Sequence, residues 1–165
     1  MSKLTAAPVS VRHKSLCCIT SDGALIITST GTQHINFYTA NTGQPLEART
    51  LSAGLGNMVT SLCVSEVAWR EAFIVAGCAD GSIYVWTLSN GAVLHHLAGN
   101  NDAITALCAS ADGEHIVATD ATSAVLRVWR FDDGALLSTL KGHTACITSV
   151  AVHPNGTIGF GWVLG

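Results

Sequence analysis

The sequence is poor in charge: only 12% of its 165 residues are Asp, Glu, Lys or Arg, and the formal net charge is −3. The eight Lys and Arg are scattered rather than gathered in a patch, which argues against direct nucleic-acid binding. Long hydrophobic runs are missing too, although 48% of the residues are hydrophobic and the mean hydropathy is +0.41. Polar residues or Gly interrupt every apolar stretch before it reaches the roughly 18 residues of a membrane span. We therefore predict a protein with no membrane partner, which meets nucleic acid only indirectly, through a complex.

The first residues carry no clear targeting signal. The first 20 residues contain Lys3, Arg12 and Lys14 and no acids, but neither an apolar signal core nor an Arg-rich amphipathic pattern. We therefore expect an intracellular protein, cytoplasmic or nuclear.

The usual motifs of catalysis are also missing. There is no G-x-G-x-x-G or P-loop motif, and no Ser stands in the strained Gly-flanked setting of an activated nucleophile. The acids lie in turns and loops, as Asp112 and Asp132 do. The sequence predicts no enzyme and no cofactor.

Six cysteines and seven histidines invite a metal interpretation, but no C-x-x-C pair occurs and His95–His96 is the only close histidine pair. No histidine has an obvious acidic partner. Cys18, Cys63 and Cys108 fall at one repeated position, where a small side chain suits a tight space between structural units. We predict no metal, and we expect Cys63 and Cys108 to be buried, free and unligated on successive inner strands.

What the sequence does contain is one segment written three times. The copies are "INFYTANTG" (35–43), "IYVWTLSNG" (83–91) and "LRVWRFDDG" (126–134), which align without a gap. They recur roughly every 45 residues, a period typical of repeat architectures in which each unit stacks on its neighbours.

Each copy belongs to a unit that reads as four short strands. In the third unit these are "ITALCAS", "HIVAT", "VLRVW" and "ALLSTL", separated by turns rich in Asp and Gly. Only residues 65–72 look helix-like. Four antiparallel strands in each unit predict the blades of a propeller.

These residues resemble the WD-repeat (WD40) family. The best marks are "LKGHTACITSVAVHPNG" (140–156), with Gly142 and His143, and "AGCADGSIYVW" (76–86), with Asp80 and Trp86. The resemblance covers roughly residues 13–158 and implies an all-β fold: an open, partial WD40 propeller of about 3.5 four-stranded blades. Residues 1–12 would be an N-terminal extension. The repeat region 13–165 would divide into units at about 13–56, 57–101, 102–144 and a partial 145–165.

The chain departs from the family pattern, in which a His, a Ser or Thr, an Asp and a Trp form a hydrogen-bonded set in each blade. Tyr38 stands at the first Trp position, whereas Trp86 and Trp129 match it. Leu55 and Asn100 stand at His positions, and the third unit has no clear turn Asp. We therefore expect the first three blades to be held mostly by apolar packing, with Trp86 and Trp129 buried.

The resemblance implies a non-catalytic scaffold for protein–protein interaction within a larger assembly. The loops that enter each inner strand are the predicted partner-binding residues: Leu55, Asn57, Asn100, Asn101, Asp102, His143 and Thr144. A role in nucleolar ribosome assembly is one alternative. A metal-binding or enzymatic protein using the His and Cys residues is the alternative from another class.

The fourth unit begins well and then loses its pattern. Trp162 falls where the second unit has Gly77, so the second strand is expected to fail and no third strand to follow. We expect an incomplete propeller. Either residues from about 160 onward come from a truncated, alternatively spliced or mispredicted reading frame, or a half-propeller completes itself by dimerisation. Its open blade edges would invite self-association.

Overall fold

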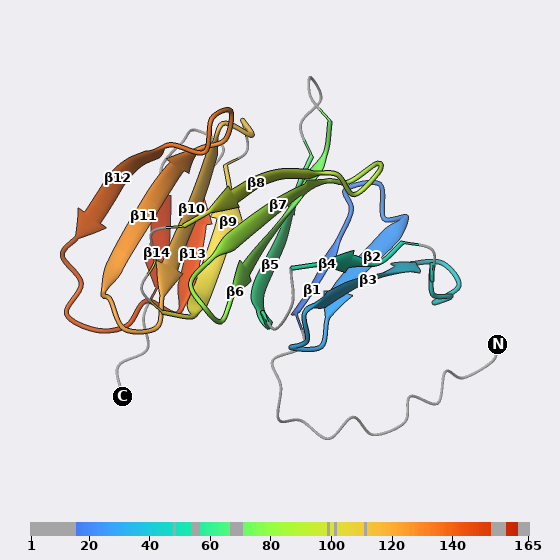
Figure 1. Cartoon of the computed structure of the whole chain (residues 1–165), viewed down its shortest axis with the longest axis horizontal. Helices are drawn as coiled ribbons and strands as arrows, with labels where there is room; N and C mark the ends of the chain where they lie inside the picture. The colour runs from blue at the N-terminus through green and yellow to red at the C-terminus, as the bar shows by residue number, and fades with distance from the viewer. Residues whose placement is uncertain are drawn as a thin grey trace.

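The computed structural model describes residues 16–47, 49–53, 57–66, 71–98, 100, 102–110 and 112–152, together with the backbone of 158–161. These residues form three four-stranded antiparallel sheets and one two-stranded sheet (Figure 1). They contain no helix, and hence none long and apolar enough to cross a membrane. The expected all-β, open partial propeller is confirmed. Each sheet is called a blade below.

Consecutive strands pair within each blade. The first blade consists of β1 (Leu16–Ile19), β2 (Leu25–Ser29), β3 (His34–Thr39) and β4 (Leu51–Ser52). The second consists of β5 (Val59–Ser65), β6 (Phe73–Cys78), β7 (Ile83–Thr87) and β8 (Val93–Leu97). The third consists of β9 (Ile104–Ala109), β10 (His115–Asp120), β11 (Val125–Arg130) and β12 (Leu136–Lys141). The first strands of successive blades lie next to one another, so each blade runs outward from an inner strand.

The turn that follows the third strand of each blade has one conformation in all three. The amides of Gly43, Gly91 and Gly134 donate to carbonyls four residues earlier, at 2.7, 3.1 and 3.1 Å. All three glycines have a positive φ, which a residue with a Cβ rarely adopts. The gapless alignment of the three copies therefore reflects one repeated hairpin.

The core lies between the blades, which stand side by side in Figure 1. Ile27, Ile35 and Phe37 of the first blade pack with Ile74 and Trp86 of the second. The next interface buries side chains of both blades in the same way: Phe73, Val75, Val85, Leu97, Ile116, Trp129 and Phe131. The expected burial of both tryptophans is confirmed. The first two blades are thus each covered by the blade that follows.

The fourth unit differs from expectation. Its second strand does form: β14 (Ile158–Gly161) pairs with β13 (Ser149–Val152) along four residue pairs. Backbone pairing does not need the repeat's side-chain pattern, which is why a mismatched sequence still extends the sheet. Trp162 and residues 67–70 of the helix-like segment 65–72 lie outside the described residues, and Ser65 ends β5.

We expect Trp86→Ala to destabilise the protein by about 3–5 kcal/mol, because it removes a buried aromatic ring from the interface between the first two blades. Urea unfolding measures the change. Val93→Ala is the control, since Val93 lies opposite Trp86 on the neighbouring strand and is 61% exposed. A loss under about 1 kcal/mol for Trp86→Ala would contradict the packing described above.

Candidate interaction surface

Loops from successive blades meet at one end of the stack. The Ala79 amide donates to the Met58 carbonyl at 2.8 Å, and the Ala121 amide donates to the Ala103 carbonyl at 2.9 Å. These bonds join the loop entering a blade to the turn between that blade's second and third strands. We call this end the loop face; it comprises residues 30–33, 57–58, 79–82, 100, 102–103, 120–124 and 142–147.

Asn100 connects two blades at the loop face. Its Nδ2 donates to the Gly81 carbonyl of the second blade at 3.1 Å, and its Oδ1 accepts from Arg127 Nη1 of the third blade at 3.0 Å. A Cβ on Gly81 would lie 2.8 Å from the Asn100 carbonyl oxygen, so the turn and the loop approach at backbone distance. Asn100 therefore fixes the position of the loop between the two blades.

Arg127 in turn pairs with Asp120, whose carboxylate is fully buried. Arg127 Nη1 lies 2.8 Å from Asp120 Oδ2, and the Ser123 amide donates to Asp120 Oδ1 at 2.7 Å. Burial alone would raise the pKa of Asp120, but the hydrogen bonds from Ser123 and the hydrogen bond and charge of Arg127 outweigh it and lower the pKa. Asn100, Arg127 and Asp120 thus form a continuous polar network.

This network adds to the expectation for the third blade. Apolar side chains such as Ile116 and Trp129 pack the blade, and the network adds a buried acid, Asp120, at its loop end. Asp120 was missed because it ends β10, two residues before the turn position that Asp80 suggests. A β-bulge shifts the register between Thr119 and Asp120, as another does at the equivalent position of the second blade, next to Cys78.

The structure brings most of the predicted partner-binding residues to the loop face. Thr144 is exposed, and Asn57, Asn100, Asp102 and His143 are partly buried. The side chains of Asn57 and Asp102 are used locally: Asn57 Nδ2 donates to the Ala53 carbonyl at 3.4 Å, and Asp102 accepts from the Ala103 amide at 2.7 Å. Leu55 and Asn101 lie outside the described residues.

Sequence reasoning missed Met58, which is 47% exposed on the loop face. It stands between a predicted loop residue and the first residue of β5, so the strand pattern alone gave no signal for its exposure.

The repeat positions Tyr38 and Gly142 are partly buried and exposed, respectively. Asp80 is exposed and accepts from the Ser82 amide at 3.0 Å. Asp80 therefore caps its own turn.

All six cysteines are free. Cys63 and Cys108 are only partly buried, which corrects the expectation of full burial. The reason is topological: β5 and β9 are the inner edge strands of their sheets, so each is hydrogen-bonded to a strand on one side only. Burial nevertheless raises the pKa of the Cys63 thiol, as do the neighbouring Cys108 and Cys18, and burial raises the pKa of Cys108 to about 11.

One acidic group lies close to a histidine, against expectation. His115 Nδ1 is 3.9 Å from Asp112 Oδ1, and with Glu114 these residues bring ligand atoms within 4.8 Å of one another. The approach results from the turn itself: Asp112 accepts from the Ser110 hydroxyl and from the Glu114 amide, and Ser110 Oγ accepts from the His115 amide. The turn explains the geometry without a bound ion.

Comparison with known proteins gives one family. The model described as "WD domain, G-beta repeat" matches residues 48–87, 91–130 and 134–160, which together make up more than half of the chain. A search of curated proteins finds no match. The first two matched segments each start before an outer strand, β4 or β8, and end with the third strand of the next blade, β7 or β11. Each of these two repeats therefore ties two neighbouring blades together covalently.

Asp120→Asn should destabilise the protein by about 3–5 kcal/mol at neutral pH, because it leaves the buried Arg127 charge without its partner. The folded-state pKa of Asp120 is lowered, so the carboxylate contributes stability above its ordinary pKa of about 4. That contribution is lost as the pH falls through the lowered pKa. The difference in unfolding free energy between wild type and variant should therefore shrink in acid.

Urea unfolding at several pH values measures this difference. Asp133→Asn is the matched control, since Asp133 pairs with Arg130 at 2.7 Å but half of each side chain is exposed. Its cost should stay below about 1 kcal/mol. Equal costs for the two variants would show that Asp120 is not a buried anchor.

Thiol labelling of the native protein should separate two fast cysteines from four slow ones. Cys17 and Cys146 are exposed. Burial raises the pKa of Cys18 to about 12 and that of Cys78 to about 11, and it raises the pKa of Cys63 and Cys108 as well. Since the thiolate is the reacting form, these four should react slowly until urea unfolds the chain. Rapid labelling of Cys63 and Cys108 without unfolding would contradict their placement.

Proposed function

Because the chain belongs to the WD40 repeat family, we propose that it is a non-catalytic scaffold whose loop face holds partner proteins within a larger assembly. WD40 repeats indicate a function in protein–protein interaction. The observation that supports the loop face is the Asn100 bridge, which ties the second and third blades to one loop. A surface that is ordered before binding loses less conformational entropy on association.

The loop face offers both apolar and polar contacts. Met58 is a large exposed apolar side chain, and Thr144 is exposed beside His143. Asp80 and Asp102 add carboxylates to the same loop face. Loops held by a rigid scaffold are where binding residues concentrate, and an exposed apolar side chain within a polar rim is typical of a protein contact. We therefore propose other proteins, rather than small molecules, as the ligands.

The proposed setting is the cytoplasm or the nucleus. The net charge of −3 fits a protein that meets nucleic acid only through its partners. A component of nucleolar ribosome assembly is a narrower version of the same proposal, in which the partners would be other assembly proteins.

The test is affinity purification of tagged protein from its native cell, comparing Met58→Asp with wild type. We expect Met58→Asp to lose at least one partner that wild type retains, because it places a charge in the proposed apolar contact. Val93→Asp is the control, since Val93 is 61% exposed on β8, away from the loop face.

Equal partner sets for the two variants would exclude Met58 from the contact. Metal analysis of the same preparation tests the alternative from another class. Stoichiometric zinc or iron would overturn the scaffold proposal in favour of a metal protein.

A further inference from the structure

Two of the three described arginines have an acidic partner, and the third does not. Arg127 pairs with Asp120 at 2.8 Å, and Arg130 pairs with Asp133 at 2.7 Å. Arg49 is partly buried between the first two blades, and it forms no ion pair with any acidic side chain of the described residues. A partly buried charge without a counter-ion is costly, so it gains more from a bound anion than an exposed charge does.

Arg49 lines a cavity of about 340 Å³ between the first and second blades. The other lining residues are Thr50, Leu51, Ser89, Asn90 and Gly91. Arg49 Nη2 donates to the Ser89 carbonyl at 3.3 Å, and the Arg49 Cζ atom lies 5.0 Å from the centre of the Phe37 ring. These two contacts hold the guanidinium in place. Neither Nε nor Nη1 has a hydrogen-bond partner among the described residues, so these N–H groups are available to a ligand.

The interface between the second and third blades contains an equivalent place. Leu51 and Leu97 hold one repeat position, since each pairs with the isoleucine of the neighbouring third strand. A glycine turn of the following blade sits on each leucine. A Cβ on Gly91 would lie 2.6 Å from Leu51 Cδ2, and a Cβ on Gly134 would lie 2.7 Å from Leu97 Cδ2. We call residues 49–51 with 89–91 the first seam, and residues 95–97 with 132–134 the second seam.

The two seams differ in charge. Two positions before the leucine stands Arg49 in the first seam and His95 in the second. The turn of the second seam carries two adjacent aspartates just before its glycine, at 132–133, whereas the turn of the first seam carries Ser89 and Asn90 there. The first seam therefore has the permanent cation, but its turn lacks the carboxylates that the equivalent turn supplies.

One acid reaches the turn of the first seam without pairing with Arg49. The Ser89 hydroxyl donates to the exposed Glu71 carboxylate, whereas the Ser89 carbonyl accepts from Arg49. Glu71 adds negative charge near the cavity, so it should weaken the binding of an anion there.

Two further side chains give the cavity hydrogen-bond donors. Asn90 Oδ1 accepts from the Thr87 hydroxyl and, at 2.9 Å, from the Ala92 amide. These bonds orient the Asn90 side chain and leave its N–H groups to donate to a ligand. The exposed Thr50 hydroxyl is the second donor.

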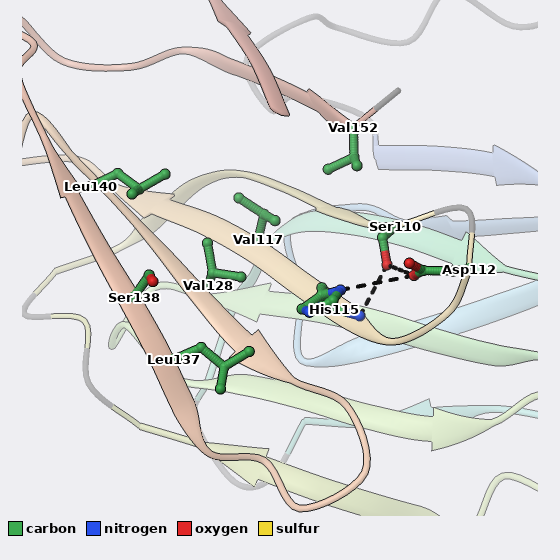
Figure 2. Close-up of a pocket in the computed structure, with 9 residues that line it drawn as sticks. All are labelled: Ser110, Asp112, His115, Val117, Val128, Leu137, Ser138, Leu140 and Val152. Carbon is green, nitrogen blue, oxygen red and sulfur yellow. Dashed lines mark hydrogen bonds and ion pairs between the residues drawn. The ribbon is translucent and has the colours of Figure 1, made fainter. Parts of the chain in front are cut away.

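A cavity of about 280 Å³ beside the third blade has the opposite character. Figure 2 shows Val117, Val128 and Leu140 on three neighbouring strands of that blade, with Asp112 and His115 at one end of the cavity. It is lined by no Arg or Lys among the described residues, and the Asp112 carboxylate would repel an anion. Of these two cavities, the one at the first seam suits a negatively charged ligand.

We propose that the cavity of the first seam binds an oxyanion on a side chain of a partner protein, either a carboxylate or a phosphate group. Arg49 pairs with the oxyanion, and Asn90 and Thr50 donate to its remaining oxygens. A guanidinium recognises both groups, because its N–H donors match two oxygens at once. The inference rests on the proposed scaffold function, but it uses a surface separate from the loop face.

The probes are three capped tripeptides whose central residue, between two alanines, is phosphoserine, glutamate or glutamine. Binding to the full chain is followed by NMR, as changes in the backbone amide signals of Thr50, Asn90 and Gly91. We expect saturable changes with phosphoserine, glutamate or both, and none with the uncharged glutamine. Binding of phosphoserine alone would assign a phosphorylated partner, and binding of glutamate alone would assign an acidic one.

Three protein variants locate the site. Arg49→Gln should weaken binding of the better probe at least about tenfold, because it removes charge-assisted hydrogen bonds. Arg130→Gln is the matched control, since Arg130 is half exposed and already pairs with Asp133. Glu71→Gln should tighten binding, because it removes a repelling charge. Thermal unfolding shows which variants fold, and Glu71→Gln keeps the proposal testable if Arg49→Gln does not.

Absence of binding to both charged probes, or equal binding of the glutamine probe, would overturn the proposal. So would equal losses in Arg49→Gln and Arg130→Gln, or unchanged binding in Glu71→Gln where Arg49→Gln does not fold. Protein carrying Met58→Asp should bind the probes as wild type does. Failure of this proposal and failure of the loop-face proposal are therefore distinguishable.

Discussion

The structure depends on one constraint: a sheet with two apolar faces is stable only when another sheet covers each face. The two interfaces between the three blades meet that constraint, and the stack is quasi-one-dimensional, with stability that is approximately the sum of blade interfaces. Phe37, Val85 and Val128 hold the same position in successive blades and face the next blade in turn. The repeat in the sequence is the repeat of this contact, since the residues that cover a face recur with the residues that form it.

The repeat also explains how much of the fold could be predicted. The strands, the hairpin turns and the burial of Trp86 and Trp129 follow from a gapless alignment, because side chains at equivalent positions meet equivalent neighbours. Where the residue type departs from the repeat, the prediction fails. The same bulge lies next to Cys78 in the second blade and next to Asp120 in the third, so an acid takes the position of Cys78, and no alignment of residue types reveals that Arg127 will meet it.

The candidate site was predictable in the same uneven way. The loops entering the inner strands could be located because each precedes a recognisable strand. The use of Asn100 as a bridge could not, since it requires the Gly81 carbonyl and the Arg127 side chain to converge from two different blades. The contact of His115 with Asp112 was missed because it depends on how one turn folds. The Ser110 hydroxyl donates to Asp112 and holds the turn closed, as Thr20 does in the first blade, where its hydroxyl donates to Asp22 Oδ1 at 2.6 Å.

The two terminal faces of the stack are consequently different surfaces. In the second and third blades Ile74 pairs with Trp86 and Ile116 with Trp129, and all four side chains are buried by the preceding blade. The same pair in the first blade, Ile26 and Tyr38, is only partly buried, and a Cβ on Gly43 would meet nothing within 4 Å. Among the described residues, the Tyr38 ring is therefore less buried than its equivalents Trp86 and Trp129, whereas the third blade borders a cavity toward β13. The polar network of Asn100, Arg127 and Asp120 links the loop end of the third blade to the second blade, in addition to the apolar interface.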